Sequence, residues 1–201
     1  MGRWQLYLGA ILGIGMSGTA HAQGARAELH GGFDRVSHRS FFSPSDSTFG
    51  PVEGGVSGLG LGYDAKIQGR IFAGIEGNVD FATGSRCQVN PLVLAPGIFE
   101  SCLSPGRDLS ANARLGVNLG NGRTRIYGLV GYTHLELNSS FQINRGPATS
   151  LRSDNRDGVR VGAGLEHDLT DRFYGKIEYR FSDYGSDITR NQAIVGVGLR
   201  F

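Results

Sequence analysis

Charged residues of both signs recur at alternate positions along this chain, and they are the side chains best placed to do chemistry. Arg26 and Glu28 alternate in one segment, and Lys176, Glu178 and Arg180 alternate in another. Alternate residues of an extended chain point to the same side, so opposite charges would share one face. Buried charges are tolerated when they are paired, so we expect a network of ion pairs inside a folded sheet. Its expected members are Arg26, Glu28, Glu76, Arg114, Glu136, Arg160, Glu166, Lys176, Glu178, Arg180 and Arg200, with Asp34 and Asp80 on the same polar faces.

Cofactor and metal sites are not expected. His30 and Glu28 share one face, but a polar interior accounts for both. Residues 58–62 contain a G-x-G string, yet no helix pattern follows, as a dinucleotide-binding loop would require. The balance of 20 basic and 18 acidic residues also argues against a nucleic-acid partner.

The first 22 residues are organised as a secretory signal peptide. Arg3 supplies the positive start, an apolar stretch runs from Trp4 to Met16, and Ala20-His21-Ala22 forms an A-x-A cleavage site. We expect cleavage between Ala22 and Gln23, which makes residues 1–22 the leader and residues 23–201 the mature domain.

Cys87 and Cys102 are the two cysteines of the chain. An exported protein folds in an oxidising compartment, where such a pair forms a disulfide. Closing a loop of about 15 residues would contribute roughly 3 kcal/mol in the chain-entropy model. A metal site or catalytic thiol is disfavoured, because there is no C-x-x-C motif and no histidine nearby.

Period-two alternation of apolar residues with glycine or polar residues predicts eight strands. The segments are 25–33, 59–63, 71–81, 109–119, 127–137, 159–166, 173–181 and 193–201. Their connections alternate between long (37–57, 83–107, 138–157) and short (64–66, 120–123, 168–171), with an intermediate one at 182–191. This alternation is typical of transmembrane barrels, in which short turns face the periplasm and long loops face outside.

Composition decides what covers the apolar face of this sheet. The 201 residues suit one domain, 33 are glycine, and 39% are hydrophobic. No internal run of about 20 apolar residues is present, which excludes a helical membrane protein. A soluble sheet packed on a core is the alternative, but there is almost no helical pattern to cover it. We therefore predict an all-β, eight-stranded antiparallel up-and-down transmembrane β-barrel whose narrow lumen is filled by its own side chains.

Four segments carry a family resemblance: 60–64, 75–80, 158–164 and 178–183. In order and spacing they resemble the opacity-protein-like, OmpA-like family of small outer-membrane barrels, in its alphaproteobacterial, porin-family form. The strand ending at Phe201 is similar to the C-terminal signal read by the barrel-assembly machinery. The resemblance implies a location in the bacterial outer membrane, contact with its lipid and lipopolysaccharide, and structural support or binding of an extracellular surface ligand.

Two other functions stay open at this point. The first is a small-solute porin. The second is a lipid A-modifying enzyme, since some small barrels use a histidine for that reaction. His134 and Glu136 are expected to share the inward face, and His38 is expected in a long loop, so we predict no catalytic residues.

Overall fold

The computed structural model describes residues 24–38, 51–91, 98–120, 122–143, 149–185 and 188–201. The expected signal peptide and the bond between Ala22 and Gln23 lie outside these ranges. The described residues contain strands and turns but no α-helix. Within them, no helix is long and apolar enough to cross a membrane.

In the described residues, nine strands make up the sheet, and every pairing among them is antiparallel. They are β1 (Ala25–His38), β2 (Val52–Gln68), β3 (Ile71–Ala82), β4 (Arg86–Pro91), β5 (Ile98–Leu119), β6 (Thr124–Ile143), β7 (Thr149–Asp168), β8 (Phe173–Asp183) and β9 (Ile188–Arg200).

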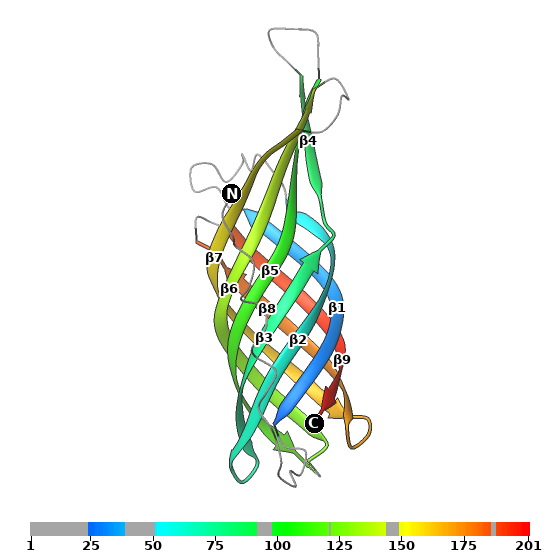
Figure 1. Cartoon of the computed structure of the whole chain (residues 1–201), viewed down its shortest axis with the longest axis vertical. Helices are drawn as coiled ribbons and strands as arrows, with labels where there is room; N and C mark the ends of the chain where they lie inside the picture. Colours follow the sequence, from blue (N-terminus) through cyan, green and yellow to red (C-terminus); the bar gives the residue numbers. More distant parts are fainter. Residues whose placement is uncertain (1–23, 39–50, 92–97, 121, 144–148, 186–187) are drawn as a thin grey trace, which may run out of the picture.

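The sheet closes into a barrel because β3 pairs with β5 as well as with β2. Strand β4 adds no ninth position around the barrel. It pairs only with the first residues of β5, Ile98–Leu103, while β3 pairs with residues 107–117 of the same strand. Strand β4 therefore continues the wall that β3 begins (Figure 1). The predicted eight-stranded antiparallel barrel is confirmed.

The strands run further than the sequence pattern predicts. Much of the expected loops 83–107 and 138–157 is strand, and β6 and β7 stay paired as far as Phe141 and Thr149. Together with β4 these strands rise beyond the rest of the barrel as a narrow sheet (Figure 1). The expected Cys87–Cys102 disulfide is confirmed and joins directly opposite positions of β4 and β5.

The first short turn lies further along the chain than expected. We predicted it around Asp64–Lys66, but β2 continues to Gln68 and the chain turns at Gly69 and Arg70. Gly69 has φ of +57°, a left-handed conformation that glycine adopts without steric cost. The longer strand turns Asp64 into the barrel.

The outward face of the barrel is apolar. Leu61, Val195 and Val197 are between 55% and 69% exposed, which indicates contact with lipid rather than with a protein core. Exposed aromatic side chains form two bands at the edges of this belt. Phe33, Phe81, Tyr132 and Tyr179 form the outer band, and Tyr63, Phe173 and Phe201 form the band at the short-turn end. Tyr127 and Tyr174, in contrast, point into the barrel and are buried.

A charge on the lipid face tests this arrangement. Val197 lies midway along the outward face of β9, so Val197→Arg should destabilise the barrel by about 2–4 kcal/mol. Thr189→Arg lies on the same strand and face but beyond the outer band, and should cost about 0–1 kcal/mol. Urea unfolding in lipid vesicles, followed by far-UV circular dichroism, measures both. Equal costs would contradict a lipid-facing belt.

Candidate functional site

The interior of the barrel gathers the chain's charged residues, because alternation turns every second side chain inward. In β1, Arg26, Glu28 and Asp34 are buried while Leu29 and Phe33 are exposed. Among the described residues, the buried cations are Arg26, Arg114, Arg160, Lys176, Arg180 and Arg190, and the buried carboxylates are Glu28, Asp34, Asp64, Glu76, Asp80, Asp108, Glu166 and Glu178. Because buried cations and buried carboxylates are present in similar numbers, they can pair with one another inside one narrow lumen. We call this set the interior network.

Glycines on β2 make room for these long side chains. A Cβ at Gly60 would lie 2.6 Å from Oδ1 of Asn78 and 2.7 Å from Cγ of Glu28, and one at Gly62 would lie 2.8 Å from Cζ of Arg26. Such contacts are too close for a side chain, so bare backbone on β2 faces the bulky charges of β1 and β3.

Near the short-turn end, three arginines are held by carboxylates of their own and other strands. The Arg26 guanidinium donates to Glu76 at 2.5 Å and to Glu28 at 3.0 Å. Arg114 donates to Glu166 at 2.7 Å. Arg200 reaches the same Glu166 at 2.5 Å. Glu166 therefore links β5 to β9 through the lumen.

In the middle of the barrel each carboxylate is also shared by several donors. The Lys176 ammonium donates to Glu28 at 2.5 Å, and Glu178 accepts from both Arg180 and Tyr127. Asp80 accepts from Arg180 at 3.1 Å. The ring of His30 lies 2.6 Å from Asp80.

Asp108 is the centre of the outer part of the interior network. Its carboxylate accepts from Arg190 at 2.6 Å, from Thr133 at 2.5 Å and from Arg160. The Arg190 guanidinium also donates two hydrogen bonds to the Asp34 carboxylate, at 2.7 and 3.1 Å. Arg160 and Arg190 are completely buried.

An apolar cluster occupies the interior beyond Asp108, toward the extended strands. Its members are Val36, Val52, Leu135, Leu137, Tyr184 and Ile188. Tyr184 connects the two regions, because its hydroxyl lies 3.3 Å from Oδ2 of Asp108. We call these six residues the apolar seal.

Every expected member of the interior network lies on the inward face except Glu136. Glu136 points outward, where its carboxylate is 3.9 Å from the exposed Arg107, and the prediction for it was wrong. Its neighbours Leu135 and Leu137 take the inward positions, as part of the apolar seal. In this part of β6 the apolar side chains face the lumen, whereas in the lipid belt they face outward.

His134 is also outward, contrary to expectation. It lies 2.6 Å from Asp157, which accepts a hydrogen bond of 2.5 Å from Tyr132 of the outer band. Hydrogen bonds from Tyr132 and His134 lower the pKa of the exposed Asp157 carboxyl. His38 ends β1, and its side chain lies outside the described part of the structure.

The sequence pattern did not reveal Asp64, Asp108 and Arg190 as interior residues. Asp64 was assigned to a turn, Arg190 was placed in the connection 182–191, and Asp108 lay just before the segment 109–119. The period-two pattern points to two of them if it is continued beyond the predicted segments. Asp108 shares the inward face with Ser110 and Asn112, and Arg190 shares it with Gln192.

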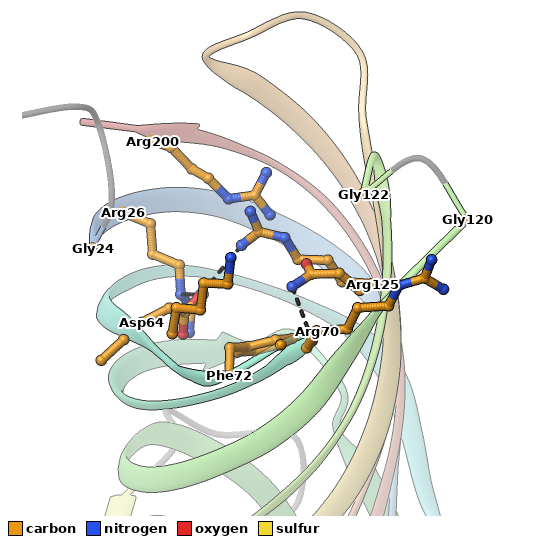
Figure 2. A pocket seen from close by; sticks show the side chains of 13 residues that line it. Gly24, Arg26, Asp64, Arg70, Phe72, Gly120, Gly122, Arg125 and Arg200 are labelled. Carbon is orange, nitrogen blue, oxygen red and sulfur yellow. Dashed lines mark hydrogen bonds and ion pairs between the residues drawn. The ribbon is translucent and has the colours of Figure 1, made fainter.

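At the short-turn end the interior opens into a cavity of about 390 Å³ (Figure 2). Arg26, Asp64, Phe72, Arg125 and Arg200 are among its lining residues.

The closed barrel, its apolar belt and its charged lumen together define an outer-membrane β-barrel protein. Residues 7–201 match the family described as the outer membrane protein beta-barrel domain, and the chain belongs to this family. The family resemblance seen in the sequence is thus confirmed, and the protein is located in the bacterial outer membrane.

One curated relative is the 25 kDa outer-membrane immunogenic protein of Brucella ovis. It is 28% identical over 134 residues, which cover 67% of this chain and 58% of the relative, so the match spans less than two thirds of that protein.

Two solved structures are similar in fold. The attachment invasion locus protein Ail of Yersinia pestis has a TM-score of 0.52 at 17% identity, covering 89% of this chain and 99% of its own. Neisserial surface protein A has a TM-score of 0.54 at 15% identity, covering 88% and 97%.

Removing the shared carboxylate of Asp108 tests the interior network. Asp108→Ala leaves Arg160 and Arg190 buried without this partner, which should cost about 3–5 kcal/mol in unfolding free energy. Glu136→Ala removes a partly exposed carboxylate that lies 3.9 Å from Arg107 and should cost at most about 1 kcal/mol. Urea unfolding in vesicles measures both. An Asp108→Ala cost as small as that of Glu136→Ala would show that the interior network does not support the fold.

Proposed function

We propose that this protein is a structural barrel of the cell envelope whose lumen is closed to solutes. The observation that carries the proposal is the set of ion pairs crossing the interior from wall to wall. Arg160, Arg180 and Arg190 have no exposed surface. An eight-stranded barrel is only wide enough to be filled by its own side chains, whereas water-filled porins have about 16–18 strands.

The apolar seal adds a second barrier in series. An ion that passed the paired charges would still have to cross a stretch lined by side chains such as Leu135 and Val52. Apolar constrictions exclude ions because water does not wet them. The cavity at the short-turn end does not change this, since it lies at the opposite end from the seal.

Conductance distinguishes the closed barrel from the small-solute porin. Purified protein in a planar lipid bilayer should show no sustained channel steps, while a 16-stranded porin in the same bilayer conducts. The Leu135→Ser variant, with the interior network intact, should also stay closed. Sustained steps from the unmodified protein would favour the porin and overturn the proposal.

We also propose that the protein is not an enzyme. His134 faces outward beside the outer band, the side from which a lipid A-modifying residue would work. Acyl transfer or hydrolysis needs a nucleophile or water positioned by the histidine. Among the described residues, the hydrogen bond of His134 is to Asp157, and no serine or cysteine hydroxyl or thiol contacts its ring. This favours a structural pair at the surface.

The extended strands support a further role in surface interaction. Arg35 and Arg107 pair with Glu53 and Glu136 at 3.5 and 3.9 Å on the outward surface near or beyond the outer band. Exposed pairs of this kind are worth little and can exchange for another anion. We propose that these arginines contact the phosphates of lipopolysaccharide. Ail has been solved with the heparin analogue sucrose octasulfate, which is a property of that protein.

Lipopolysaccharide binding can be measured directly. Arg35→Ala combined with Arg107→Ala should weaken binding of lipopolysaccharide to the refolded barrel by about tenfold, from the loss of two charge-assisted contacts. Arg172→Ala, at the opposite end, is the matched control and should bind normally. Unchanged binding by the double variant would reject the proposed contact.

Export and assembly remain predictions. The expected leader and its cleavage between Ala22 and Gln23 would bring the chain to the periplasm. The outward residues of β9, ending in the 61% exposed Phe201, would then be read by the barrel-assembly machinery.

A further inference from the structure

The cavity at the short-turn end is unusual in its charge. Its charged lining consists of the cations Arg26, Lys66, Arg70, Arg125 and Arg200 and the single carboxylate Asp64. Figure 2 shows Arg26, Arg125 and Arg200 around one space, with Asp64 and Phe72 beside it. A volume of about 390 Å³ lies within the range of small-molecule sites.

Asp64 makes no hydrogen bond to the guanidiniums around it. It lies 3.5 Å from Arg26, 3.4 Å from Arg114 and 3.9 Å from Arg125, and none of these contacts is a hydrogen bond. The buried Nε atoms of the three arginines have no hydrogen-bond partner within the described structure. Arg26 and Arg114 are also paired with Glu76 and Glu166, whereas the carboxylate contact of Arg125 within the described structure is the one to Asp64. Of these three guanidiniums, that of Arg125 is thus the least neutralised by the protein.

The remaining cations are either fixed in place or exposed at the rim. Arg200 is held by Glu166 and Asp168 and stacks on the Tyr174 ring, 4.1 Å from its centre. The guanidinium of Arg125 lies 5.7 Å from the centre of the Phe72 ring. Lys66 and Arg70 line the rim, and no ion pair of theirs is found among the described residues. The cavity is thus preorganised for an anion, with fixed cations inside and further cations at its entrance.

We propose that this cavity binds a phosphate-bearing anion. Guanidinium groups bind phosphate through paired, charge-assisted hydrogen bonds, and several converging cations suit a tetrahedral group with two charges better than a planar carboxylate with one. The short-turn end of an outer-membrane barrel faces the periplasm. The phosphate therefore comes either from a soluble periplasmic anion or from a phospholipid headgroup of the inner leaflet.

Calorimetric titration of the refolded barrel in an uncharged, phosphate-free detergent tests the proposal. Pyrophosphate is the soluble probe and short-chain phosphatidylglycerol is the lipid probe. We expect saturable binding of at least one probe. Arg125→Gln should weaken that binding by about tenfold or more, through loss of a charge-assisted hydrogen-bond donor. Arg125 makes only distant contacts, 3.9 Å to Asp64 and 5.7 Å to the centre of the Phe72 ring, so the variant should fold.

Matched controls separate the cavity from general basic charge. Arg172→Gln changes an exposed arginine at the same end that does not line the cavity, and should bind as the unmodified protein does. Heat-modifiable gel migration verifies that each variant is folded. Binding of pyrophosphate alone assigns a soluble anion, and binding of phosphatidylglycerol alone assigns a lipid headgroup.

Three results would overturn the proposal. One is the absence of saturable binding by both probes. The second is equal weakening by Arg125→Gln and Arg172→Gln. The third is binding of citrate as tight as that of pyrophosphate, which would show that the cavity does not select phosphate.

Discussion

Backbone hydrogen bonding in hydrocarbon is the constraint on which this structure depends. A sheet with a free edge would leave N–H and C=O groups without partners in lipid, at a cost of several kcal/mol each. The pairing of β3 with β5 removes that edge. Closure then separates the two faces of every strand, so that apolar side chains meet lipid and charged side chains meet one another. The interior network is a direct consequence of that separation.

Inside so narrow a barrel, one carboxylate pairs with more than one arginine. Glu166 holds Arg114 and Arg200, and Asp108 holds Arg160 and Arg190. Each carboxylate joins strands distant in sequence, so ion pairs cross-link the wall through the lumen. Bare backbone at Gly60 and Gly62 supplies the space that these long side chains need. Removing a single partner leaves an uncompensated charge, which is why such networks tolerate little change.

The interior differs along the barrel axis. The outer end holds the apolar seal, the middle holds closely paired charges, and the short-turn end opens into a cavity with an excess of cations. A uniform filling would be expected if the lumen had only to be stable. The two ends of the lumen therefore present different surfaces, one apolar and one lined mainly by cations.

The sequence alone determined the strand number, the lipid belt and most of the interior network, because alternation with period two survives wherever one face meets lipid. It also determined the disulfide, since Cys87 and Cys102 are the two cysteines of the chain. Only the tertiary structure decided that Glu136 and His134 lie on the outward face of β6, because in that part of the strand Leu135 and Leu137 face the lumen. It also decided the position of Asp64, which depends on the turn at Gly69, and the convergence of Arg26, Arg125 and Arg200. Those three arginines lie on separate strands, and only the closure of the barrel brings them around one cavity.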